Sequence, residues 1–287
     1  MVEEKAVENI ILELPRKRNE KGEITEEGID GNYAVISINR PDRLNAITLQ
    51  LINEISEVLR DLELNSNVRC VVLRGVKEYT KKPSFSVGQD LSSVLPPTIQ
   101  PNIPMSMSNL IHIYHRAFDE FEQLSKPLIA AIDGFALGGG TEISLMCDIV
   151  IASRRSVFGL TEVLRGIFPA GGGTQRLAKR IGLNRALRVL FFGEMFPAEQ
   201  MYQWGLVNFL VEDNEFEEKV QEKAKWLGNA ATTALFNIKK CIKFGTRYEQ
   251  LGLIMEQFGA GINSASSDRA EGRKAFLGKK EPNYKGA

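Results

Sequence analysis

Hydrophobic residues along this chain fall into short continuous runs that predict buried strands. Three such runs lie at residues 68–75, 127–134 and 148–153. Runs of this length, bounded by Gly, Pro or Asp, are typical of parallel strands that are covered on both faces. Two earlier runs, at 10–14 and 33–39, predict strands joined by a long, charged and solvated hairpin connection.

Segments with helical periodicity separate these runs. Apolar residues recur every three or four positions after Thr48, which is expected to cap a helix with its hydroxyl group. A second helix is expected at about 111–124, after a loop rich in Pro, Ser and Asn at 95–107. Alternating strands and helices predict a layered α/β fold with repeated β–α units.

The pattern changes in the second half of the chain. After Gln175 the periodicity is mostly helical, with one strand-like run at 206–211. We therefore expect a β/α core at 1–205, followed by a mainly helical C-terminal region at 206–287.

Charge and cysteine content narrow the function class. The chain has 287 residues, with 36 Lys and Arg against 36 Asp and Glu. This balance argues against a general attraction to nucleic acid or to an anionic membrane. No apolar run has the length of a membrane span, and the first residues lack the apolar region of a signal peptide. Three widely spaced cysteines show no disulfide or zinc pattern, so a cytoplasmic location is expected.

Histidine is scarce, which limits the available chemistry. His112 and His115 are the only two, and a position on a helix surface or pocket wall explains them. A Ser-His-Asp triad or a His-rich metal site is therefore disfavoured, and no metal is expected. Acid–base chemistry must come mainly from carboxylates, Lys, Tyr or Cys.

Three glycine-containing segments are candidates for binding negative charge. The segment 134–142 follows a predicted strand and opens a predicted helix, so its glycines can expose backbone N–H groups at a helix N-terminus. It has neither the Walker nor the Rossmann spacing. A second glycine cluster lies at 168–177, and Gly88 can turn the N–H of Gln89 into a pocket. Turns and close packing are the competing interpretation of all three.

Two glutamates lie in strongly apolar surroundings. Glu142 lies just inside the helix that follows the first glycine cluster, and Glu162 lies in the segment FGLTEVLRG. A solvated surface position is the ordinary alternative for each. Burial and a nearby like charge would raise the pKa of such a carboxyl group into a range that is useful for proton transfer.

These segments, in this order, resemble the crotonase (enoyl-CoA hydratase/isomerase) superfamily. The resemblance runs from about Ile10 to Lys285. It rests on the sequences INRPDRLNAI, FSVGQDL, AAIDGFALGGGTEISLMCDIVIAS, FGLTEVLRGIFPAGGGTQRLAKRIG and SSDRAEGRKAFLGKKEPNYKG. The implied fold is a ClpP/crotonase-like spiral of β-β-α units, with a helical C-terminal region that builds trimers, commonly paired into hexamers.

The resemblance also implies a mechanism. The backbone N–H groups of Gln89 and Gly139 would form an oxyanion hole for the thioester oxygen of an acyl-CoA substrate. Glu142 would orient and activate a water molecule for attack at Cβ, and Glu162 would supply the proton at Cα. Enoyl-CoA hydratase is therefore the expected activity, with dehydration as the reverse reaction.

The expected CoA path follows from the same resemblance. Arg43, Leu44, Val87, Gln89 and Asp90 match positions along that path. Phe276 and Lys279 match tail positions that reach the CoA of a neighbouring subunit. Acyl-CoA is the expected substrate, and no tightly bound cofactor is implied.

Some residues depart from the family pattern. Gln89 replaces a small residue, and Ala170 replaces a frequent Gly near the expected water. With the loop at 95–107, these differences favour an acyl group that is bulkier or more functionalised than a short enoyl chain.

Other functions compete with hydration. Double-bond isomerisation or another lyase step would use the same enolate chemistry, and a non-catalytic acyl-CoA-binding subunit would use only the binding site. A Clp-like serine protease fails because no Ser-His pairing is available.

Overall fold

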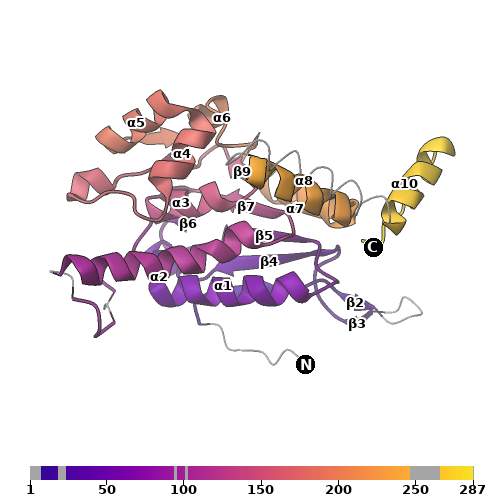
Figure 1. Ribbon diagram of the computed structural model, residues 1–287, viewed down its shortest axis with the longest axis horizontal. Coiled ribbons are helices and arrows are strands. Elements are labelled where there is room, and N and C mark those ends of the chain that lie inside the picture. Colours follow the sequence, from indigo (N-terminus) through magenta and orange to yellow (C-terminus); the bar gives the residue numbers. More distant parts are fainter. Residues whose placement is uncertain (1–7, 19–23, 94–95, 101–102, 246–265, 287) are drawn as a thin grey trace.

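Two sheets form the centre of the fold in the computed structural model, which describes residues 8–18, 24–93, 96–100, 103–245 and 266–286 (Figure 1). The larger sheet has the order β1 (Ile10–Glu13), β4 (Tyr33–Ile38), β5 (Cys70–Gly75), β7 (Leu128–Ile132), β9 (Ile149–Ser153) and β12 (Phe209–Val211). The smaller sheet has the order β11 (Met195–Pro197), β10 (Val157–Gly159), β8 (Phe135–Leu137) and β6 (Ser84–Ser86). From β4 to β12 the larger sheet is parallel, and only β1 is antiparallel to its neighbour.

The helices complete a spiral. After each of β5, β7 and β9, the chain adds a short strand to the smaller sheet and then enters a helix. This is the β-β-α repeat that the family resemblance implies. The helices are α1 (Leu49–Leu64), α2 (Pro104–Gln123), α3 (Gly139–Met146), α4 (Gly173–Ile181), α5 (Leu183–Phe192), α6 (Ala198–Gln203), α7 (Phe216–Asn229), α8 (Thr232–Gly245) and α10 (Ser267–Leu277), with short 3-10 turns η1 (Pro41–Arg43) and η2 (Glu162–Arg165).

The larger sheet is covered on both faces. One hydrophobic cluster joins side chains such as Val71 and Leu73 of β5 to α1 and α2. Their sequence neighbours Cys70 and Val72 belong to a second cluster with Phe216 and Val220 of α7. Because successive strand residues point to opposite faces, β5 is apolar over its first four residues, and its buried Arg74 is instead paired with Glu217 at 2.5 Å.

The expected helix after Thr48 is confirmed. The Thr48 hydroxyl accepts a hydrogen bond from the Leu51 N–H at 3.1 Å, and the predicted apolar stripe is buried. The helix predicted from residue 111 begins earlier, at Pro104, so the end of the expected loop at 95–107 was assigned wrongly. Proline is favourable in the first turn of a helix, which explains why a Pro-rich segment can open one.

Two further boundaries differ from the sequence-based expectation. The strand expected at 206–211 is confined to β12, because Leu206 and Val207 are buried in the turn before it. The charged connection after β1 contains a small hairpin of β2 (Lys17–Arg18) and β3 (Ile24–Glu26). Across the residues that the structure describes, no helix has both the length and the apolar character needed to cross a membrane.

Candidate active site

The segment after β6 presents one free backbone donor. The N–H of Ile47 donates to the Gly88 carbonyl at 2.8 Å, and the N–H of Asp90 donates to the Ile47 carbonyl at 2.8 Å. Gly88 has a φ of +91°, a conformation that favours glycine. These two hydrogen bonds hold Gly88 and Asp90, on either side of Gln89, against Ile47. The Gln89 N–H takes part in neither of them.

A second donor comes from the start of α3. Gly139 is the first residue of this helix and follows Gly138, whose φ is +52°. A methyl group placed on Gly139 would lie 3.8 Å from the Gln89 nitrogen, and one placed on Gly88 would lie 3.1 Å from the Gly139 nitrogen. No hydrogen bond between described residues uses either N–H. The fold therefore brings together the two donors expected from the sequence.

Glu142 is held in the first turn of α3. Its side chain is buried, and its Oε1 accepts a hydrogen bond from the Gly173 N–H at 2.8 Å. Burial raises the pKa of this carboxyl group, while the N–H groups of Gly173 and Gly171 and the charge of Arg176 oppose the increase. The second glycine cluster thus holds one of the two candidate carboxylates.

Glu162 faces the same region from η2. Its Oε1 would lie 3.2 Å from a methyl group on Gly138, beside the second oxyanion donor. Its Oε2 is buried and has no hydrogen-bond partner among the described residues. Burial, with a smaller contribution from the negative charge of Glu142, raises the pKa of Glu162 to about 7. A carboxyl group with this pKa can give and take a proton near neutrality.

Helix α2 adds a wall that the sequence did not assign to the site. The Gln89 side-chain amide donates to the Tyr114 hydroxyl at 3.0 Å. Phe118, one turn further on, packs so closely that a methyl group on Gly171 would lie 3.1 Å from its ring. His115 is exposed on α2, in agreement with its expected place on a helix surface, and its Nε2 lies 2.5 Å from the Ala170 carbonyl oxygen. The spacing of four between Tyr114 and Phe118 is the only sequence signal that could have indicated this wall.

The residues expected along the CoA path form one continuous edge. Leu44 follows η1 in a left-handed conformation, and its carbonyl accepts from the Val87 N–H at 3.2 Å. Arg43, beside it, is exposed. The Asp90 carboxylate pairs with Arg40 at 3.0 Å, and hydrogen bonds from Ser92 and Arg40 lower the pKa of Asp90. Asp90 therefore fixes the loop with its side chain.

The two tail residues lie apart from this edge within one chain. Lys279 is exposed and follows α10, which Figure 1 shows well away from α3. Phe276 belongs to α10, but its side chain lies outside the described residues.

A groove of about 900 Å³ opens next to the Gln89–Tyr114 contact. Its lining comes from the N-terminal segment, α1, the segment after Asp90 and α2. The lining residues are Glu8, Asn9, Arg40, Thr48, Leu49, Gln50, Asn53, Glu54, Glu57, Ser93, Pro96, Pro97, Leu110 and Tyr114.

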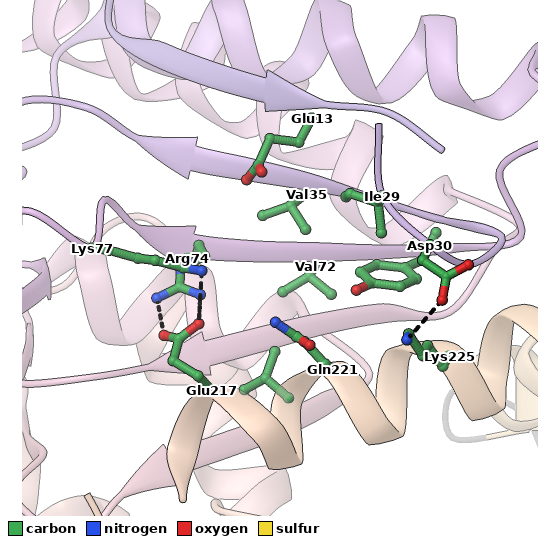
Figure 2. Close-up of a pocket in the computed structure, with 12 residues that line it drawn as sticks. Glu13, Ile29, Asp30, Val35, Val72, Arg74, Lys77, Glu217, Gln221 and Lys225 are labelled. Atoms are coloured by element: carbon green, nitrogen blue, oxygen red, sulfur yellow. Dashed lines mark hydrogen bonds and ion pairs between the residues drawn. The ribbon is translucent and has the colours of Figure 1, made fainter. Parts of the chain in front are cut away.

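A smaller cavity of about 180 Å³ lies on the other face of the larger sheet, under α7. Figure 2 shows the Arg74–Glu217 ion pair at one end and Lys225 beside Asp30 at the other. No residue that the sequence predicts for the site lines this cavity. In the part of the chain that the structure describes, no group of three or more His, Cys, Asp or Glu side chains is placed to hold a metal ion.

Known proteins match nearly the whole chain. Residues 28–287 match the family model described as "Enoyl-CoA hydratase/isomerase". The short-chain-enoyl-CoA hydratase of Clostridium acetobutylicum is 35% identical over 259 residues, which cover 88% of this chain and 94% of that protein. The 1,2-epoxyphenylacetyl-CoA isomerase of Escherichia coli is 30% identical, with 90% of this chain and 97% of that protein covered.

A solved structure agrees with the same assignment. The crystal structure of an enoyl-CoA hydratase from Bacillus anthracis superposes with a TM-score of 0.81 at 34% identity, covering 89% of this chain and 96% of that one. The crotonase fold expected from the sequence is therefore confirmed. By fold and by sequence, this chain belongs to the enoyl-CoA hydratase/isomerase family of the crotonase superfamily, close to the enoyl-CoA hydratases, and is an enzyme of the hydratase lyase type.

Proposed function

We propose that this enzyme hydrates trans-2-enoyl-CoA thioesters to 3-hydroxyacyl-CoA and catalyses the reverse dehydration. The observation that carries the proposal is the convergence of two backbone donors, the buried carboxyl group of Glu142 and the partly buried carboxyl group of Glu162. Glu142 follows the Gly139 donor in α3, and Glu162 lies against Gly138 from η2. Enolate chemistry with a water molecule needs these four groups in one place.

The oxyanion hole supplies the electrostatic part of the mechanism. The N–H groups of Gln89 and Gly139 donate to the thioester oxygen, where negative charge develops as the enolate forms. Each donor of this type lowers a barrier by roughly 3–4 kcal/mol in other enzymes. Both donors are fixed before the substrate binds, so little reorganisation is needed during the reaction.

The two carboxyl groups divide the proton transfer. Glu142, as the carboxylate, takes a proton from water while the water oxygen bonds to Cβ. Glu162, as the carboxylic acid, gives its proton to Cα as the enolate collapses. The pair holds one proton before and after the step: hydration starts with this proton on Glu162, and dehydration starts with it on Glu142.

Binding of CoA and self-association complete the proposal. The edge formed by Arg43, Leu44, Val87 and Gln89 receives the CoA chain, chiefly through backbone atoms. The C-terminal region at 206–287 assists assembly into trimers or hexamers, in which Phe276 and Lys279 reach the CoA of a neighbouring subunit. The cytoplasm, where acyl-CoA is available, is the proposed location.

The test is the loss of the conjugated enoyl thioester absorbance when the purified enzyme is mixed with crotonyl-CoA. Glu142→Gln and Glu162→Gln are each expected to lower kcat by about 10²–10⁴-fold. Glu218→Gln, an exposed glutamate on α7, is the matched control and should leave kcat unchanged.

Product analysis decides between hydration and its competitors. Formation of 3-hydroxyacyl-CoA supports the proposal. A shifted double bond with no added water would replace it by isomerisation. Tight acyl-CoA binding without any turnover would replace it by a non-catalytic binding role.

A further inference from the structure

The backbone turn that holds Glu142 is itself held by a guanidinium group. This glycine turn, residues 170–173, lies so close that methyl groups on Gly171 and Gly173 would be 2.5 and 3.0 Å from the Glu142 carboxylate oxygens. Arg176, in the first turn of α4, donates from Nη1 to the Gly171 carbonyl at 3.0 Å. Its guanidinium also crosses Gly172, where a methyl group would overlap it. Arg176 therefore fastens the turn beside the carboxylate.

Helix α2 anchors both the guanidinium and the glycine turn. The Arg176 Nε donates to Glu122 Oε1 at 2.8 Å, and the two side chains are mostly shielded from solvent. His115 contacts the Ala170 carbonyl through Nε2 at 2.5 Å, and Phe118 packs against the same turn. These three residues of α2 are spaced by three and four positions, so they share one face of the helix. One face of α2 thus braces the segment that holds Glu142.

These contacts also act on the charge of Glu142. The charged groups that face it are Arg176 from α4, His115 from α2 and Glu162 from η2. Burial raises the pKa of Glu142, while the N–H groups of the glycine turn and the positive charges of Arg176 and His115 oppose the increase. Loss of the Arg176 guanidinium would remove one of these charges and would also release the turn that supplies the N–H groups.

We propose that Arg176 is a positioning residue, which holds the glycine turn against Glu142 so that this carboxylate stays ionised and in place. The proposal rests on the proposed function, because it deepens the role of Glu142 as the group that activates water. Arg176 acts through the turn, and Glu122 sets the direction of its guanidinium. The role needs a fork of donors, since one side chain must serve a carboxylate and a backbone carbonyl at once.

The first experiment measures hydration of crotonyl-CoA by variants of the full chain. Arg176→Gln is expected to lower kcat by about tenfold to a hundredfold, as for a displaced catalytic group, with KM changed by less than about twofold. Arg176→Lys keeps the charge but lacks the fork, so its kcat should be intermediate. Arg154→Gln is the matched control and should leave kcat unchanged. Arg154 makes a comparable Nε contact of 2.7 Å with Glu212, outside the site.

The pH profile separates positioning from simple support of the fold. Glu142 must be ionised to take a proton from water, so kcat/KM falls as the pH drops through its pKa. Loss of the opposing interactions raises this pKa further, so the acidic limb of Arg176→Gln should move to higher pH. The acidic limb of Arg176→Lys should stay closer to that of wild type. An acidic limb that is the same in Arg176→Gln and wild type would overturn the proposal, even if the variant is less stable.

A double-mutant cycle tests the anchor on α2. Glu122→Gln should lower kcat less than Arg176→Gln, because the Gly171 carbonyl still holds the guanidinium. The double variant should lose no more activity than Arg176→Gln alone, since both substitutions break the same chain of contacts. Losses that simply add would overturn the anchoring role of Glu122.

Two measurements test the role of Arg176 without turnover. Carbon-13 NMR of labelled glutamate carboxyl groups, with Glu142→Gln to assign the signal, should give a higher pKa for Glu142 in Arg176→Gln than in wild type. A crystal structure of Arg176→Gln should show the Gly173 N–H further from Glu142 than the 2.8 Å of wild type. An unchanged pKa or an unchanged turn would overturn the proposal. If the wild-type enzyme does not hydrate crotonyl-CoA, the proposed function fails, and these two measurements still decide whether Arg176 positions Glu142.

Discussion

At the scale of single residues, Glu162 combines two unusual properties. One of its carboxylate oxygens is buried without a hydrogen-bond partner in the described structure, and its pKa is raised to about 7. An ionised carboxylate in such a place lacks the compensation that buried charges normally have. The site therefore favours the protonated form of Glu162, in agreement with the proton-donor role proposed for it.

This pKa predicts the pH dependence of the reaction. The active pair holds one proton, so kcat/KM should fall on the alkaline side with an apparent pKa near 7, as the last proton leaves. It should also fall on the acidic side when both carboxyl groups are protonated. A pH–rate profile with crotonyl-CoA measures both limbs. A profile that stays flat from neutral to alkaline pH would contradict the assignment of Glu162.

The same residue predicts a pH-dependent stability. Since the pKa of Glu162 is higher in the folded protein than the ordinary 4.5, its contribution to stability is full below pH 4.5 and is lost as the pH rises through about 7. Glu162→Gln removes this ionisation. The Tm of the variant relative to wild type should therefore increase between pH 5 and pH 8 in thermal unfolding. A Tm difference between Glu162→Gln and wild type that is the same at pH 5 and at pH 8 would contradict this prediction. The control variant Glu218→Gln should show no change of its Tm difference with pH.

At the scale of elements, the proposed oxyanion hole depends on two backbone segments in contact. A methyl group on Gly140, in the first turn of α3, would lie only 2.3 Å from the Ser86 carbonyl oxygen of β6. The two donors come from the chain on either side of this contact, Gln89 after β6 and Gly139 at the start of α3. Their spacing is therefore set by how closely α3 approaches β6.

Gly140→Ala should separate these elements. Overpacking of this type costs about 1–3 kcal/mol of folding free energy. A displacement near 1 Å at the donors should lower kcat by about a hundredfold. Denaturant unfolding and crotonyl-CoA kinetics measure the two effects. Gly205→Ala, in a left-handed position after α6, should cost stability by roughly 1–2 kcal/mol but keep kcat. Equal kcat values for Gly140→Ala and Gly205→Ala would contradict the role of the α3–β6 contact in setting the spacing of the donors.

The elements also show what sequence alone can predict. The four inner strands of the larger sheet, β4, β5, β7 and β9, were visible because strands that are covered on both faces are mainly apolar. The three-residue strands β6, β8 and β10 are too short to show a period, and none was predicted. The glutamates and glycines that the structure brings together were proposed from the sequence, whereas the contact of Tyr114 with Gln89 was not. That contact joins residues 25 positions apart, which no local pattern encodes.

At the scale of the whole molecule, apolar side chains collect on the outer side of η2 and α5. Phe168 and Phe191 are both 69% exposed, and Leu164 is 68% exposed. The two elements adjoin, since a methyl group on Gly193 would touch Leu164. A surface patch of this kind marks a site of association. It lies beside η2, so a second copy of the chain that covered it would also restrain the segment carrying Glu162.

Self-association through this patch predicts a change in mass on mutation. The wild-type protein should have a solution mass that is a multiple of 32.0 kDa. Phe191→Ser with Phe192→Ser should shift the protein to a smaller species in light scattering after size exclusion. Leu64→Ser, at an exposed position on α1, should not. A wild-type protein that is already monomeric would rule out the prediction.

Gln89 contributes its main chain to the proposed oxyanion hole, and its side chain contacts the wall that α2 forms beside it. A mutation at this position alters the wall but cannot delete the donor, since every residue except proline carries the same N–H. A single codon change can therefore alter substrate preference while the catalytic step persists. In evolutionary terms, the substrate range of such an enzyme can drift under selection without passing through an inactive ancestor.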